Sequence, residues 1–207
     1  MRRATLLIII SLLTFVEVMA QQATPAVTVY REFQPATVYL SSGKKLNLSL
    51  ANIFLKNSSL LYKSGAQTKE ANMKTLERVE FGDRTYYRLD TILAYRVDTV
   101  GREALYCAQQ IDFKAYQQLL VNNSQFTSLS LGDMVGYTTA EIGVEDRLPI
   151  ISLFYFSLGG KYVLAHERHL KRVLSKEQRR RMAAVMSERD FSWLNEQCLL
   201  KVLRAIQ

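Results

Sequence analysis

Two histidines are the only imidazole groups of the chain, and they stand close together in the run His166–His169. The run misses the spacing of a zinc peptidase, because Leu170 occupies the place of the second histidine. Histidines three residues apart can share a helix face, but no third metal ligand is visible beside them. Because His166 lies four residues before Leu170 and His169 four before Val173, the spacing predicts structural, partly buried histidines and no metal site.

A hydrolytic nucleophile would depend on the same two histidines, and no Gly-x-Ser-x-Gly turn is present to display a serine. Cys107 falls in a predicted strand and Cys198 on an apolar helix face, which is typical of buried, unreactive thiols. A Cys107–Cys198 disulfide is an alternative that an exported chain permits. A pair of carboxylates, as in a glycosidase, stays open because that chemistry depends on spacing in the fold. Phosphate-binding loops and dinucleotide glycine patterns are absent from the sequence, so no cofactor is predicted.

The first twenty residues have the pattern of a cleavable secretory signal. Arg2 and Arg3 precede an apolar run over residues 4–16, and Ala20 ends a short segment that a signal peptidase accepts. The run is shorter than the roughly 20 residues that a membrane-spanning helix needs. We therefore expect a mature chain that begins at Gln21, is not an integral membrane protein, and lies in the periplasm or cell envelope or is secreted.

The excess of positive charge gathers at the C-terminal end. The formal net charge is +8, and residues 161–207 hold eleven basic side chains against five acidic ones. A nucleic-acid partner is not expected for an exported chain, so the charge favours an envelope protein or an anionic envelope component. Helical geometry selects four candidate partner-binding residues: Arg168, Arg172, Lys176 and Arg180. The alternative is a solvated helix face that binds no partner.

In the first half of the mature chain, short β segments form the predicted scaffold. From Val27 to Ile111 they alternate with turn residues, which predicts an antiparallel meander. Leu46, Leu48 and Leu50 alternate with polar residues, the pattern of a strand with one buried face. We expect a β-rich module over residues 21–112 and an α+β region over residues 113–207, packed together as one unit.

The second region mixes helices with strands. Asp112 predicts a helix that runs to about Val121, followed by strands over residues 126–131 and 134–137 and by a hairpin over residues 150–165. Ser175 and Gln178 form a capping box, and Ser192 is the predicted cap of a last helix. Apolar stripes predict the buried helix faces, which include Leu170, Val173, Leu174, Met182, Leu194, Cys198, Leu199, Val202, Leu203 and Ile206. The fold class that follows is α+β: a strongly bent antiparallel sheet or small open barrel with C-terminal helices.

Two stretches of the β-rich module carry a resemblance. Phe33–Leu40 and Ala51–Tyr62 resemble exported envelope proteins of Gram-negative anaerobic bacteria that are themselves uncharacterised. The resemblance covers about half of the mature chain and contains no catalytic motif. It implies an envelope location and no activity.

Three hypotheses for the function follow. The leading one is a non-catalytic exported envelope protein that acts by contact, with a β scaffold and a basic helical tail. The second is a small exported hydrolase that uses His166, His169 or a carboxylate pair, which requires a deep polar cleft. The third is a small barrel that binds a ligand in an enclosed apolar cavity.

Overall fold

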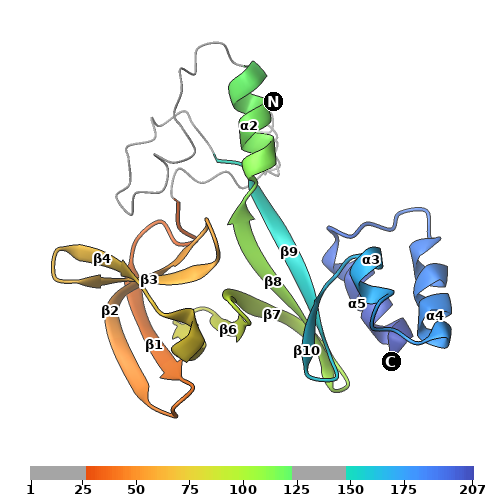
Figure 1. Cartoon of the computed structure of the whole chain (residues 1–207), viewed down its shortest axis with the longest axis horizontal. Coiled ribbons are helices and arrows are strands. Elements are labelled where there is room, and N and C mark those ends of the chain that lie inside the picture. Colours follow the sequence, from red (N-terminus) through yellow and green to blue (C-terminus); the bar gives the residue numbers. More distant parts are fainter. Residues whose placement is uncertain (1–26, 123–147) are drawn as a thin grey trace, which may run out of the picture.

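A single antiparallel sheet organises the molecule. A computed structural model describes residues 27–122 and 148–207 and contains ten strands in the order β10-β9-β8-β7-β6-β5-β1-β2-β3-β4. The sheet curls into a half-barrel at its N-terminal end, and helices lie beside its C-terminal end (Figure 1). The strands are β1 (Gln34–Leu40), β2 (Lys45–Phe54), β3 (Ser59–Ser64), β4 (Gln67–Glu70), β5 (Leu76–Phe81), β6 (Thr85–Leu89), β7 (Ile92–Val100), β8 (Glu103–Ile111), β9 (Ile150–Leu158) and β10 (Lys161–Leu164). The helices are the 3-10 turn η1 (Met73–Thr75), α2 (Phe113–Asn122), α3 (Glu167–Leu170), α4 (Lys176–Met186) and α5 (Glu196–Ile206).

The curl is held by the turn between β2 and β3, which docks onto β7 and β8. The N–H of Leu93 donates to the carbonyl of Ser58 at 2.7 Å, and the N–H of Ile111 donates to the carbonyl of Leu55 at 2.8 Å. The Ser58 hydroxyl donates to the carbonyl of Gln109 at 3.0 Å. Ser58 is fully buried and has a positive φ of 54°, a conformation that few residues other than glycine adopt. The turn therefore joins two distant parts of the sheet.

Apolar side chains fill the inside of the half-barrel. They come from strands β1, β2, β3, β5, β6 and β7 and pack as one buried cluster. The buried amide of Asn52 fixes the preceding segment on this core, because it exchanges hydrogen bonds with the backbone of Tyr30 and donates to the carbonyl of Glu32. The cluster consists of Ala36, Val38, Ala51, Ile53, Leu60, Leu76, Val79, Phe81, Tyr86 and Leu93.

A second core joins the helices to the other end of the sheet. Helix α5 packs on β7 and β8, with Leu199, Val202 and Leu203 buried beneath it. Helix α4 packs on α5 and contributes Met182. The side-chain amide of Gln178 donates to the carbonyl of Ile206 at 2.6 Å and so ties the start of α4 to the end of α5. Helix α5 thus packs directly on the sheet, and α4 packs on α5.

Many local predictions are confirmed. Asp112 accepts a hydrogen bond from the N–H of Ala115 at the start of α2, and the Ser175–Gln178 capping box is present at the start of α4. Strands β9 and β10 form the predicted hairpin. An antiparallel, curled sheet with C-terminal helices is present. The predicted strands over residues 126–131 and 134–137, and the signal peptide, lie outside the described residues.

Several predictions of burial and of boundaries are wrong. Leu46 and Leu50 are 47% and 41% exposed, because β3 pairs with β2 only from Ala51 onward and leaves the earlier part of β2 uncovered. Val173 and Leu194 are exposed as well. Helix α5 begins after Asn195 and not after Ser192: the Asn195 side chain accepts from the N–H of Cys198, whereas Ser192 accepts from Leu194 within the preceding turn.

Candidate functional site

A groove lies where the turns of two hairpins meet the helices. In an antiparallel meander every second connection lies at the same end of the sheet, so the β7–β8 and β9–β10 turns lie together (Figure 1). Gly101, Gly159 and Gly160 form these turns with positive φ. We call this cavity of about 740 Å³ the end groove; it is lined by Arg102, Glu103, Leu158, Gly159, Lys161, Arg172, Val173, Leu174, Gln178, Ile206 and Gln207.

The charges in the end groove are mostly positive and unpaired. Among the described residues, Arg102, Lys161 and Arg172 take part in no ion pair. The acidic residue of the groove, Glu103, accepts a hydrogen bond from the N–H of Gly159 at 3.1 Å. The groove therefore presents three cations to an incoming ligand, and its carboxylate already has a partner.

The four predicted partner-binding residues are exposed, and the structure brings them together only in part. Arg172 lines the end groove. Arg168 lies on α3 and Arg172 in the turn that follows this helix, whereas Lys176 and Arg180 lie one turn apart on α4. We call these four residues the basic face. In the described part of the chain none of them has a carboxylate partner, whereas their neighbours Lys171 and Arg181 pair with Glu167 and Glu177.

Sequence reasoning missed Arg102 and Lys161. Each directly follows the glycine of a hairpin turn. This position is informative only when the order of strands β7 to β10 in the sheet is known. The sequence alone does not give the strand order, so it could not predict that the two turns lie at the same end of the sheet.

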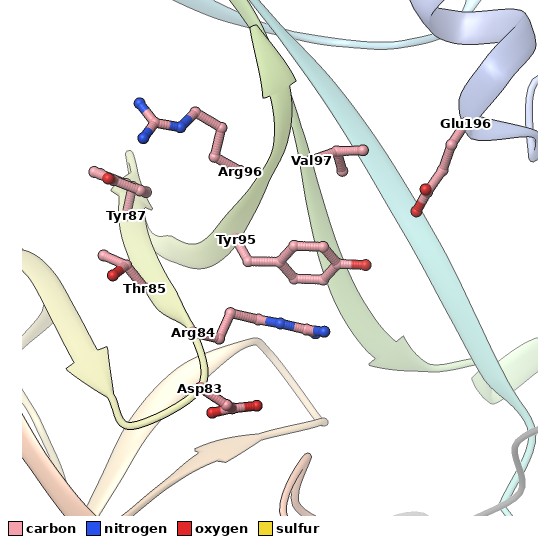
Figure 2. Close-up of a pocket in the computed structure, with 8 residues that line it drawn as sticks. All are labelled: Asp83, Arg84, Thr85, Tyr87, Tyr95, Arg96, Val97 and Glu196. Atoms are coloured by element: carbon pink, nitrogen blue, oxygen red, sulfur yellow. The ribbon is translucent and has the colours of Figure 1, made fainter.

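A second pocket lies where β6 and β7 separate. Strand pairing between them reaches Tyr86 and Tyr95 and then stops, which opens a fork that the start of α5 borders (Figure 2). The cavity measures about 520 Å³, and the Glu196 carboxylate points into it. We call it the fork pocket; it is lined by Asp83, Arg84, Thr85, Tyr87, Tyr95, Arg96, Val97 and Glu196.

Aromatic contacts hold the arginines of the fork pocket. The Arg84 guanidinium lies 4.1 Å from the centre of the Tyr95 ring, and Arg96 lies 5.3 Å from the centre of the Tyr87 ring. Burial raises the pKa of Tyr95 above that of a free phenol. Asp83, on the rim, accepts a hydrogen bond from the Tyr30 hydroxyl at 2.9 Å. The fork pocket thus brings two carboxylates, Asp83 and Glu196, to one cavity.

The histidines have structural contacts, but only His169 is partly buried as predicted, and His166 is exposed. The Nδ1 atom of His166 accepts a hydrogen bond from the N–H of Arg168 and so caps α3. The His166 ring lies 5.8 Å from the Trp193 ring and 6.2 Å from the His169 ring. Neither histidine lines the end groove or the fork pocket. Over residues 27–122 and 148–207, no three His, Cys, Asp or Glu side chains are grouped as metal ligands.

The two cysteines are free and lie in different surroundings. Cys107 is buried beneath α5, and burial raises the pKa of its thiol. Cys198 is partly exposed, and its sulfur lies 3.6 Å from the carbonyl oxygen of Asp190. The disulfide between them stays a prediction.

No helix in the described part of the chain is long and apolar enough to cross a membrane. In comparisons with known proteins, no protein family, no curated protein and no solved structure matches this chain.

Proposed function

We propose that the protein is a non-catalytic exported envelope protein that binds an acidic partner through the basic face and the end groove. The partner is an envelope protein or an anionic envelope component. The signal-like first twenty residues and the resemblance to exported envelope proteins support the location. Neither observation identifies the partner, so that part of the proposal depends on the basic face and the end groove.

One observation carries the proposal: a set of exposed cations without carboxylate partners borders a groove. Exposed cations gain little from pairing within the chain, and many are simply solvated. Here, however, Arg172 belongs both to the basic face and to the groove, where Arg102 and Lys161 join it. Three cations around one cavity raise the local concentration of an anion and contact it together.

The contacts of the catalytic candidates favour binding over hydrolysis. His166 already accepts a backbone hydrogen bond, and the buried Cys107 thiol holds its proton more firmly than a free thiol does. Of the carboxylates in the fork pocket, Asp83 is exposed and hydrogen-bonded to Tyr30. A ligand inside the half-barrel is also disfavoured, because the buried cluster fills its interior.

The test changes Arg172, Lys176 and Arg180 together to Glu and measures sedimentation with isolated envelope material. At low salt the parent protein sediments with the envelope and the triple variant stays in the supernatant. Because the Debye length falls from about 10 Å at 0.1 M salt to about 3 Å at 1 M, high salt releases the parent as well.

A matched control separates a local contact from net charge. Changing Arg31, Lys69 and Lys74 to Glu alters the net charge equally, on exposed positions of the N-terminal half. This control sediments like the parent if the proposal is right. Equal sedimentation of the parent and the basic-face variant at every salt concentration, with both folded, contradicts it.

A further inference from the structure

The first half of β2 has an open edge. On one side, residues 45–48 pair with β1; on the other side, pairing with β3 begins only at Ala51. Beyond Tyr62, β3 continues with β4 as its neighbour, and in Figure 1 the β3–β4 hairpin turns away from the β1–β2 hairpin. Among the described residues, the stretch 45–50 therefore lacks a strand on this edge.

Alternate backbone groups of this stretch face the open edge, where no described strand pairs with them. The N–H of Leu40 donates to the carbonyl of Lys44, and the direction of the backbone groups alternates along an antiparallel pair from there. By this alternation the backbone groups of Leu46 and Leu48 face β1, whereas those of Lys45 and Asn47 face the open edge. The alternation ends at Leu48, because the register with β1 shifts between Leu48 and Ala51. An edge of this kind is a template for an additional strand.

The side chains of the stretch make a two-sided surface. Leu46 is 47% exposed and lies on the same sheet face as Leu48; Leu50, 41% exposed, follows where the register with β1 shifts. Lys45 and Asn47 occupy the opposite face and are exposed. An added strand would gain backbone hydrogen bonds and would cover the leucines with its alternate side chains.

The charge around the edge indicates what would bind there. From Phe33 to Lys69 the chain contains no Asp or Glu and contains five lysines, at positions 44, 45, 56, 63 and 69. None of the five takes part in a described ion pair. A second copy of the chain would bring the same lysines against these, so self-pairing is opposed by like charge.

We propose that residues 45–50 accept an extended acidic segment of another protein as an added antiparallel strand. Its apolar side chains, at every second position, cover Leu46 and Leu48. Its acidic side chains, at the positions between them, face Lys45 and the flanking Lys44 and Lys63. This edge lies in the half-barrel, apart from the basic face, and the proposal does not depend on the proposed function.

The test uses a labelled synthetic peptide of alternating valine and glutamate, followed by fluorescence anisotropy and by hydrogen exchange of residues 45–50. The peptide binds and slows exchange at Lys45 and Asn47, whose amides face the open edge. Two control peptides do not bind: one with lysine in place of glutamate, and one whose backbone is N-methylated and cannot pair. Equal binding of all three, or protection that maps elsewhere, overturns the proposal.

Variants of the protein locate the binding. Asn47→Pro removes an outward N–H and leaves the backbone hydrogen bonds to β1 in place, and it weakens peptide binding by tenfold or more, about 1.4 kcal/mol. It also loses the hydrogen bond that the Thr37 hydroxyl donates to the Asn47 side chain, and so does the Asn47→Ala control. Asn47→Ala keeps the N–H and keeps the binding. Leu46→Thr removes the most exposed apolar side chain of this face and weakens binding, which keeps the test valid where the proline variant does not fold. Protection of residues 45–50 that grows with protein concentration in the absence of peptide would assign the edge to a second copy and overturn the proposal.

Discussion

The N–H of Leu93 donates to the carbonyl of Ser58 at 2.7 Å, and this bond joins the turn after β2 to the strand on the far side of the half-barrel. The Ser58 hydroxyl extends the junction to β8 through the carbonyl of Gln109. A buried residue with positive φ thus bridges two strands that are far apart in the order of the sheet.

Substitutions of Ser58 test this junction. Ser58→Val loses the hydroxyl bond and places a β-branched residue at positive φ, so we expect the free energy of unfolding to fall by about 2–4 kcal/mol. Ser58→Gly loses the same bond but accepts the backbone conformation, and it costs about 1 kcal/mol. Urea denaturation followed by circular dichroism measures both. Equal losses for the two variants would show that the backbone conformation is unimportant.

Helix α5 is expected to be part of the core. Leu199 is fully buried between the helix and the sheet, so Leu199→Ala lowers the free energy of unfolding by about 2–5 kcal/mol. Leu194, 68% exposed just before the helix, is the control, and Leu194→Ala changes stability by less than about 0.5 kcal/mol. Thermal and urea unfolding compare them. A Leu199→Ala variant as stable as the control would mean that α5 is peripheral.

Local sequence patterns predicted the positions of helices and strands better than they predicted which side chains are buried. The Ser175–Gln178 capping box depends on residues within one turn, and it is present. The leucines of β2 alternate as a buried strand face does, yet Leu46 and Leu50 are exposed, because burial depends on where β3 turns away. No pattern within six residues contains that information.

The candidate site was predictable only in part for the same reason. Arg172 was recognisable, because basic residues cluster in the helical tail. Arg102 and Lys161 are far from it in the sequence and join it through the order of the hairpins. The fork pocket likewise depends on two strands separating, which brings Asp83 to the same cavity as Glu196 at the start of α5. Tertiary structure, not composition, creates both sites.

Alkaline pH should destabilise the protein. Burial raises the pKa of the Cys107 thiol above 9.0 and those of Tyr30, Tyr86, Tyr95, Tyr106 and Tyr155 above 10.0. The folded state therefore holds these protons more tightly than the unfolded state does. The resulting stability is complete below pH 9 and is lost as the pH rises through the raised values.

Melting temperatures from pH 7 to pH 11 check this expectation. The melting temperature of the parent falls above pH 9 to 10, where the thiol and the phenols ionise in the unfolded chain. Tyr155 is the cleanest residue to change, because burial alone raises its pKa. Tyr155→Phe removes that proton and gives a shallower loss. A parent that melts at one temperature over the whole range would contradict the assignment.

Photo-crosslinking in cells that make the protein tests the central claim, binding through the basic face, most directly. A photoreactive amino acid replaces Lys176 or Arg180 on the basic face, or Lys69 or Lys74 on the N-terminal half, all of them exposed. We predict one dominant adduct with an acidic component from positions 176 and 180, its loss when Arg172 is changed to Glu, and no such adduct from positions 69 and 74. Equal adducts from all four positions, or none from positions 176 and 180 in a folded protein, would contradict the claim.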